Sequence, residues 1–151
     1  MAVDIPAMSG ARIARHLSGN ADSRSMEGEV MVQVIGIEHV QLAMPRGEEE
    51  SARHFYADLL GIPEVPKPPH LAVRGGCWFE RSALKLHLGV EDPFFPAKKA
   101  HPALVVSGLR VLVDRLKAAG AAIVEDPLDG FDRVYTADPF GNRIELMEPT
   151  N

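Results

Sequence analysis

The sequence contains a single cysteine, Cys77, among its 151 residues. One cysteine cannot form an intramolecular disulfide, and it excludes the thiolate-rich structural zinc sites, which need several cysteines. The scarcity of cysteine therefore predicts a domain that folds without covalent crosslinks, and it favours a reducing, cytoplasmic compartment.

Positive charge and long apolar runs are also scarce. The chain has 16 Lys and Arg residues against 21 Asp and Glu residues, for a net charge of −5. The basic residues are scattered, which argues against nucleic-acid binding because phosphate groups are bound by clustered Lys and Arg. No apolar run approaches the roughly 20 residues of a membrane-spanning helix. We therefore expect a small-molecule partner, with no nucleic acid and no membrane.

Residues 1–33 differ in composition from the rest of the chain. Ser, Gly, Ala, Arg and Met alternate there without a period, which predicts a flexible leader or a non-native extension. Met26 and Met31 could each begin a shorter chain. The remaining residues, 34–151, are predicted to form a single domain with two modules, at about 34–90 and 100–149.

The first module has the pattern of a strand, a helix and three further strands. Residues 34–44 are rich in β-formers and end at Pro45, so they are predicted to form a strand. Residues 48–60 carry apolar side chains at helical spacing and are followed by Gly61, which is typical of an amphipathic helix and its end. Short β-like stretches follow at 64–67, 76–81 and 84–90. The first module is therefore predicted to be βαβββ.

The same order of elements begins again at residue 101. A strand is predicted at 101–106, a helix at 109–119 that stops at Gly120, and strands at 122–125, 133–137 and 143–148, with a turn at 138–142. Because the order repeats element by element, we expect an α+β fold in which two βαβββ modules form a curved mixed sheet around a metal cavity.

Four side chains occupy matched positions in the two modules. His39 and His87 lie on the first and last strands of the first module, 87−39 = 48 residues apart, and His101 and Glu145 lie on those of the second, 145−101 = 44 residues apart. Two modules related by a pseudo-two-fold axis would bring these four side chains together. Imidazole and carboxylate ligands suit one divalent metal ion, with Fe, Zn, Ni, Co and Mn not distinguished.

Strand alternation assigns faces to these residues. Leu86 and Leu88 point away from His87, and the neighbours of Glu145 on either side are apolar, so the polar side chains are predicted to share the face opposite the helices. Tyr135 and Arg133 share one face of the preceding strand, where they could orient an anionic or enolate-like substrate; a cross-strand packing pair is the alternative.

Two further residues are candidates for the substrate pocket. Gln41 lies on the same side of its strand as His39, and Trp78 could line an aromatic pocket. Packing in the hydrophobic core is the alternative for Trp78.

Several segments together resemble the vicinal oxygen chelate superfamily, which includes glyoxalases, bleomycin resistance proteins and ring-cleaving dioxygenases. They are IEHV at 37–40, FYADLLG at 55–61, LHL at 86–88, AHPA at 100–103 and DPFGNRIEL at 138–146. The resemblance implies that His39, His101 and Glu145 are metal ligands and that the protein is a homodimer. His87 stands where glyoxalase I enzymes have a glutamate that can act as a base, whereas in extradiol dioxygenases this position would be a pocket residue.

Two functions follow from these expectations. The first is a metal-dependent lyase, isomerase or dioxygenase that acts on a small oxygenated substrate chelated to the ion. The second is a metal-free protein of the bleomycin-resistance type that sequesters a drug or metabolite. The ligand set favours the first, because buried histidines and a carboxylate without an ion must find other partners.

Overall fold

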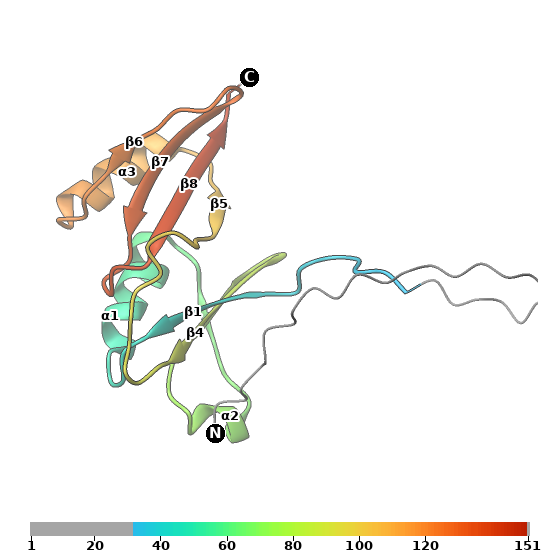
Figure 1. Cartoon of the computed structure of the whole chain (residues 1–151). Helices are drawn as coiled ribbons and strands as arrows, with labels where there is room; N and C mark the ends of the chain where they lie inside the picture. Colours follow the sequence, from blue (N-terminus) through green and yellow to red (C-terminus); the bar gives the residue numbers. More distant parts are fainter. Residues whose placement is uncertain (1–31, 151) are drawn as a thin grey trace, which may run out of the picture. The chain divides into compact units, whose positions relative to one another are not determined.

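The first module begins with an edge strand and a helix, and its remaining strands follow after a loop. The computed structural model describes residues 32–150 (Figure 1). In chain order the first module contains β1 (Val40–Met44), α1 (Glu49–Arg53), the π-helical η1 (His54–Leu59), β2 (Glu64–Val65), the short helix α2 (Pro69–Ala72), β3 (Trp78–Arg81) and β4 (Leu84–Val90). The sequence did not predict α2.

The second module repeats this order without the extra helix. It contains β5 (Ala103–Val105), α3 (Leu109–Ala118), β6 (Val124–Glu125), β7 (Phe131–Ala137) and β8 (Arg143–Pro149). In each module the first strand pairs in parallel with the last, and the other strands pair antiparallel, in the orders β1-β4-β3-β2 and β5-β8-β7-β6. The predicted α+β fold of two βαβββ modules is therefore confirmed, with its eight strands in two mixed sheets.

From Gly36 onward the described residues form one compact unit. The predicted leader, residues 1–33, lies outside the described residues except for its last two. None of the helices found between residues 32 and 150 is long and apolar enough to cross a membrane.

The first strand is shorter than predicted. It begins at Val40, and residues 32–39 have no regular secondary structure. Val40 pairs with Leu86, so the same register would place Glu38 opposite Leu84, where β4 begins. Residues before Glu38 therefore have no strand alongside them in this sheet, and Ile37 is 85% exposed. The prediction of a strand over 34–44 was wrong for its first half, because pairing depends on the partner strand as well as on local β-propensity.

Two other boundaries differ from the prediction. The helix expected over 48–60 changes from α to π geometry at His54, with the amide of Leu60 donating to the Phe55 carbonyl at 3.0 Å. Strand β5 begins at Ala103 instead of residue 101. Pro102 has no amide hydrogen and cannot donate to the ladder, which explains the later start.

The hydrophobic core lies on one face of each sheet. Leu86 and Leu88 of β4 are almost completely buried, as are Ile144 and Leu146 of β8. Leu116 of α3 packs into the same cluster. The strand alternation read from the sequence is therefore confirmed, and it leaves the opposite face of each sheet for polar side chains.

A buried polar network connects the two modules. The Asn142 side chain accepts from the Ala97 amide at 2.9 Å and donates to the Ala43 carbonyl of β1 and to Asp138, both at 2.8 Å. The Tyr56 hydroxyl donates to Asp138 at 2.9 Å. Burial raises the pKa of Asp138 and also that of Tyr56. Because Tyr56 and Ala43 belong to the first module, these bonds hold the modules together.

Candidate functional site

His101 and Glu145 form a direct pair on the second sheet. His101 lies just before β5 and Glu145 in the middle of β8, and their Nε2 and Oε2 atoms are 2.9 Å apart. The pairing of Ala103 with Glu145 places His101 diagonally across from the carboxylate. The structure thus brings together the two residues that were predicted as ligands in the second module.

The hydrogen bond at the other ring nitrogen of His101 determines whether Nε2 of the neutral ring can donate to Glu145. Nδ1 lies 2.7 Å from the backbone carbonyl of Lys99, which can only accept a hydrogen bond, so Nδ1 carries a hydrogen. In the neutral ring, Nε2 then has a lone pair directed at a carboxylate oxygen, and two acceptors repel each other. The pair therefore needs a cation between its acceptors, either a proton or a metal ion. A histidine oriented by a carbonyl in this way is typical of metal ligands.

Glu145 is held in its ionised form. Glu145 is only 8% exposed, and this burial disfavours the charged form of its carboxyl group. The hydrogen bond to His101 and the positive charge of Arg133, whose Nη1 lies 3.4 Å from Oε1, outweigh the burial and lower the pKa of Glu145. The carboxylate is consequently available as an anionic ligand at neutral pH.

Tyr135 and Arg133 lie on the same face as Glu145. Tyr135 of β7 pairs directly with Glu145, and its ring meets the His101 ring edge-on with 5.4 Å between centroids. Arg133 is held in place by Asp126, to whose carbonyl and carboxylate it donates at 2.6 and 2.8 Å. Both residues therefore border the His101–Glu145 pair, and their catalytic roles stay predictions.

His39 and His87 form the corresponding pair on the first sheet. Their rings stack with 4.4 Å between centroids, and the Trp78 indole covers the other face of His87 at 4.1 Å. His87 is 5% exposed, and its Nε2 has no hydrogen-bond partner among the described residues. The closest carboxylate oxygen, on Glu80, is 3.7 Å away. Burial and the neighbouring His39 lower the pKa of His87, so the structure leaves a neutral, unpaired nitrogen inside the protein.

The two pairs occupy equivalent register positions in their two sheets. Gln41 pairs with His87, and His39 precedes Gln41 by two residues. Ala103 pairs with Glu145, and His101 precedes Ala103 by two residues. The matched positions noted in the sequence therefore correspond to equivalent positions in the two parallel strand pairs.

The structure does not bring the two pairs to one point. Within residues 32–150, no three His, Cys, Asp or Glu side chains lie close enough to hold one metal ion. Each pair belongs to its own sheet, where the strand register fixes it. The expectation that the pseudo-two-fold of a single chain gathers His39, His87, His101 and Glu145 is therefore not met, whereas the assignment of each as a ligand stays a prediction.

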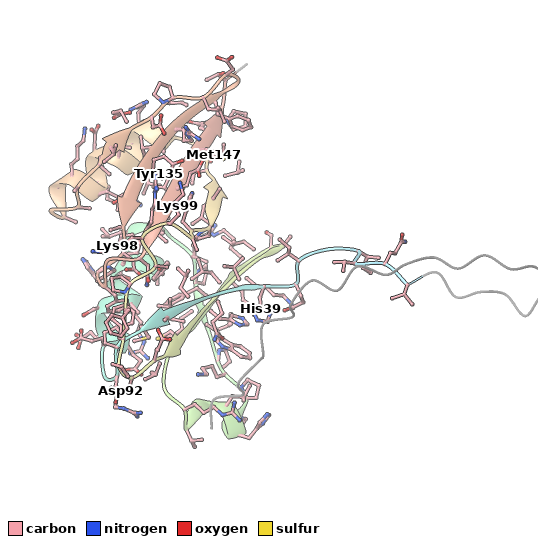
Figure 2. All side chains as sticks on the ribbon, viewed as in Figure 1. His39, Asp92, Lys98, Lys99, Tyr135 and Met147 are labelled. Atoms are coloured by element: carbon pink, nitrogen blue, oxygen red, sulfur yellow. The ribbon has the colours of Figure 1, made fainter. Side chains whose placement is uncertain are left out.

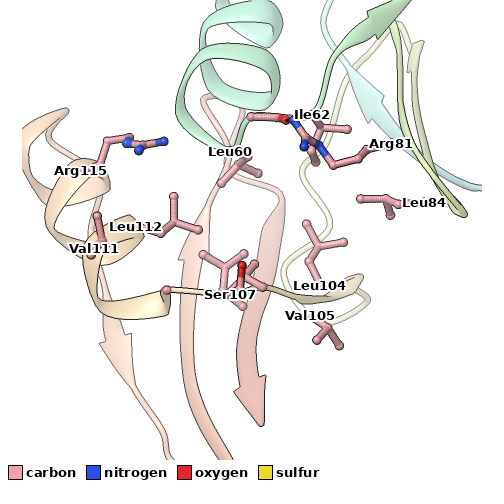
Figure 3. Close-up of a pocket in the computed structure, with 14 residues that line it drawn as sticks. Leu60, Ile62, Arg81, Leu84, Leu104, Val105, Ser107, Val111, Leu112 and Arg115 are labelled. Atoms are coloured by element: carbon pink, nitrogen blue, oxygen red, sulfur yellow. Dashed lines mark hydrogen bonds between the residues drawn. The ribbon is translucent and has the colours of Figure 1, made fainter.

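Two pockets bear on the candidate site, one beside the predicted ligands and one apart from them. One of about 380 Å³ is lined by the predicted pocket residue Gln41 together with His101. Another of about 550 Å³ lies between the end of η1, the start of β4 and the start of α3, and is walled by Leu60, Leu84 and Leu112 (Figure 3). None of the predicted site residues lines this second pocket, so it is separate from the candidate site.

Sequence reasoning assigned no role to three groups that lie near these pairs. Arg143 shares the face of Glu145, as the period of two along β8 already indicated. Glu80 approaches His87 only because β3 and β4 are neighbours. The Lys99 carbonyl, which orients His101, is a backbone group and leaves no signal in the sequence. Figure 2 labels Lys99 in the segment before β5, Tyr135 on β7 and His39 just before β1.

Comparison with known proteins identifies the family. The model of the glyoxalase-like domain matches residues 41–147. A solved glyoxalase family protein from Bacillus anthracis is 44% identical, with a TM-score of 0.75, and the match covers 80% of this chain and 100% of that one. No curated protein matches the chain.

Two more distant structures share the fold. A glyoxalase/dioxygenase from Nostoc punctiforme is 19% identical, with a TM-score of 0.65 and coverage of 89% of this chain and 100% of that one. A fosfomycin resistance protein from Listeria monocytogenes is also 19% identical, with a TM-score of 0.61 and coverage of 78% and 96%. The chain belongs to the glyoxalase-like domain family of the vicinal oxygen chelate superfamily.

Proposed function

We propose that this protein is a metal-dependent enzyme that acts on a small oxygenated substrate chelated to one divalent ion. The observation that carries the proposal is the pair of acceptors at His101 and Glu145, whose lone pairs face each other at 2.9 Å while a backbone carbonyl occupies the other ring nitrogen. A divalent ion bound by imidazole and carboxylate polarises a carbonyl or activates water, and an iron ion also activates dioxygen.

The remaining ligands would come from a second copy of the chain. One chain supplies two separate pairs, and a typical catalytic metal site needs at least three protein ligands. Strands β1 and β5, which begin one residue after His39 and two residues after His101, are edge strands of their sheets. A symmetric homodimer that joins the first module of one copy to the second module of the other would form two identical sites. His39 would then complete the ligand set, with His87 as a fourth ligand.

The residues around the pair would position the substrate. Arg133 is fixed by Asp126 and keeps Glu145 ionised, and Tyr135 presents a hydroxyl on the same face. A phenol and a guanidinium beside the ligands can hold an enolate-like oxygen. Gln41 and Trp78 would border the pocket. The single buried Cys77 supports a reducing, cytoplasmic location.

Metal content tests the proposal directly. Protein purified without chelators is analysed for metals, then stripped with EDTA and reloaded in turn with each of the five candidate ions. We expect about one ion per chain in the wild type and in His70→Ala, an exposed control histidine on α2. His101→Ala and Glu145→Gln should lose most of it. Less than a few tenths of an ion in reloaded wild type, or unchanged loading in His101→Ala, would refute the proposal.

A mixing experiment tests whether two copies share each site. If both residues are ligands, neither the His39→Ala variant nor the His101→Ala variant should bind the metal ion by itself. When the two variants are unfolded, mixed in equal amounts and refolded, half of the dimers contain one chain of each kind. Shared sites predict one intact site in each mixed dimer, or about a quarter of wild-type loading. No recovery would contradict a site shared between copies.

A metal-free binding protein is the second candidate. Glu145 already has His101 and Arg133 as partners, so the pair can exist as a protonated ion pair without a metal. Trp78 and His87 also form a flat aromatic stack that suits ligand binding. This candidate predicts no metal uptake, together with the same thermal stability before and after EDTA treatment.

A further inference from the structure

Arg143 lies on β8 near the His101–Glu145 pair, and its guanidinium has no carboxylate partner among the described residues. It precedes Glu145 by two residues on β8 and therefore lies on the same face of the sheet. Its guanidinium carbon lies 3.8 Å from the centre of the Tyr135 ring. Within residues 32–150, no Asp or Glu side chain forms an ion pair with it.

Five of the other arginines in the described chain form ion pairs or backbone hydrogen bonds, whereas Arg46 and Arg74 are exposed. Arg53 is paired with Glu64, Arg110 with Asp132 and Glu125, and Arg133 with Asp126 and Glu145. Arg81 and Arg115 donate to the backbone carbonyls of Gly61 and Leu59 at the end of η1. Arg143 differs because it is half-buried, stacks on an aromatic ring and keeps its in-plane donors unused.

The position of the Arg143 guanidinium over the Tyr135 ring leaves its hydrogen-bond donors free. A cation above an aromatic face is attracted by the ring, which restricts its movement. The N–H groups at the edge of the plane match the two oxygens of a carboxylate or phosphonate. Tyr135 thereby prepares Arg143 for an anion without neutralising its charge.

The charge of the surrounding site also favours an anion. Arg133 and Arg143 contribute two positive charges, and Glu145 and Asp126 contribute two negative ones. Adding a divalent ion at His101 and Glu145 leaves a net charge of about +2, which an anionic substrate would reduce. Two residues along a strand span about 7 Å, so a substrate chelated near Glu145 reaches Arg143 through a few bonds.

We propose that Arg143 selects substrates that carry an oxyanionic group, carboxylate or phosphonate, a few bonds from the chelating oxygens. This inference rests on the proposed function, because it takes the chelating end of the substrate to lie at His101 and Glu145. Arg143 is then a specificity-determining residue, and Tyr135 is the positioning residue that holds it.

The test compares catechol probes that differ in one substituent, which is a carboxylate, a phosphonate or a neutral amide. Binding of 3,4-dihydroxybenzoate, 3,4-dihydroxyphenylphosphonate and the neutral 3,4-dihydroxybenzamide is measured by calorimetry with the wild type, Arg143→Gln and Arg143→Lys. Arg74→Gln, an exposed arginine of the first module, is the control for net charge. All four proteins are measured both metal-loaded and after EDTA treatment, and their metal content is determined separately.

We expect the wild type and Arg74→Gln to bind the two anionic probes about 10-fold or more tightly than the amide. Arg143→Gln should lose this preference while its affinity for the amide and its metal content stay the same, and Arg143→Lys should keep part of it. A preference retained in Arg143→Gln, or absent from metal-loaded wild type, overturns the inference. If the protein takes up no metal but still prefers the anionic probes, and this preference depends on Arg143, the proposed metal site is refuted. The anion site at Arg143 is then supported.

Discussion

Replacing Asn142 by alanine tests how strongly the buried network holds the two modules together. The side chain is fully buried and makes three hydrogen bonds, to the Ala97 amide, the Ala43 carbonyl and Asp138. Each bond contributes about 1 kcal/mol net, so Asn142→Ala should lower the free energy of unfolding by about 3 kcal/mol. For a domain of this size, that corresponds to a fall of roughly 10 °C in Tm.

Two companion variants separate the hydrogen bonds from the volume of the side chain. Asn142→Asp has nearly the same shape but cannot donate to Ala43, and it places a second carboxylate beside Asp138. It should therefore be at least as destabilising as the alanine variant at neutral pH. Tyr56→Phe removes only the bond to Asp138 and should cost about 1 kcal/mol.

The measurement is urea unfolding followed by circular dichroism, with the change in midpoint converted through a common m-value. A loss below about 1 kcal/mol for Asn142→Ala would show that the network adds little to stability. Wild-type stability in Asn142→Asp would show that side-chain volume matters, and the hydrogen-bonding argument would then be refuted.

Three further predictions concern the first module and α3. A Cβ at Gly76 would lie 2.1 Å from the Leu88 carbonyl oxygen, whereas Gly120 has a similar φ and open space. Gly120→Ala should therefore cost about 1–2 kcal/mol and Gly76→Ala several kcal/mol more; equal losses in urea unfolding would contradict the steric argument. The Gly76 amide donates a hydrogen bond to Glu49 and lowers the pKa of this carboxyl group. The bond therefore stabilises the folded protein fully above the ordinary pKa of Glu49, and the stabilisation is lost as the pH falls through the lowered pKa. Glu49→Gln should remove that loss from unfolding curves recorded at pH values below the ordinary pKa of 4.5, and an unchanged loss of stability with falling pH would count against it. Burial raises the pKa of Cys77 to about 11, so a thiol reagent should modify native protein far more slowly than urea-unfolded protein; equal rates would exclude a buried thiol.

Local patterns in the sequence were sufficient for much of the architecture. The order of elements, the repeat of βαβββ and the turn at 138–142 follow from hydrophobic period, turn residues and helix-ending glycines. Alternation also predicted that Leu86 and Leu88 would be buried on one side of β4, and that Tyr135 and Arg133 would share one face of their strand. These properties depend on neighbours within a few residues, so they can be derived without knowing the partner strands.

Other features depended on segments far away in the chain. Residues 34–37 lie outside strand β1 because β4 begins at Leu84, opposite Glu38, although these residues have the composition of a strand. Likewise, the unpaired nitrogen of His87 results from the stacking of Trp78 and from the distance to Glu80. No local pattern contains this information, because it arises from strand pairing.

The sequence alone determined which side chains occupy equivalent places in the two modules. Only the tertiary structure decided how these side chains meet: His39 with His87, and His101 with Glu145, in two separate sheets. The physical reason is that a side chain's face is a property of its own strand, whereas convergence depends on how sheets, and copies of the chain, pack against one another. The unpaired charge of Arg143 became visible for the same reason, since only the folded chain shows which carboxylates are already engaged.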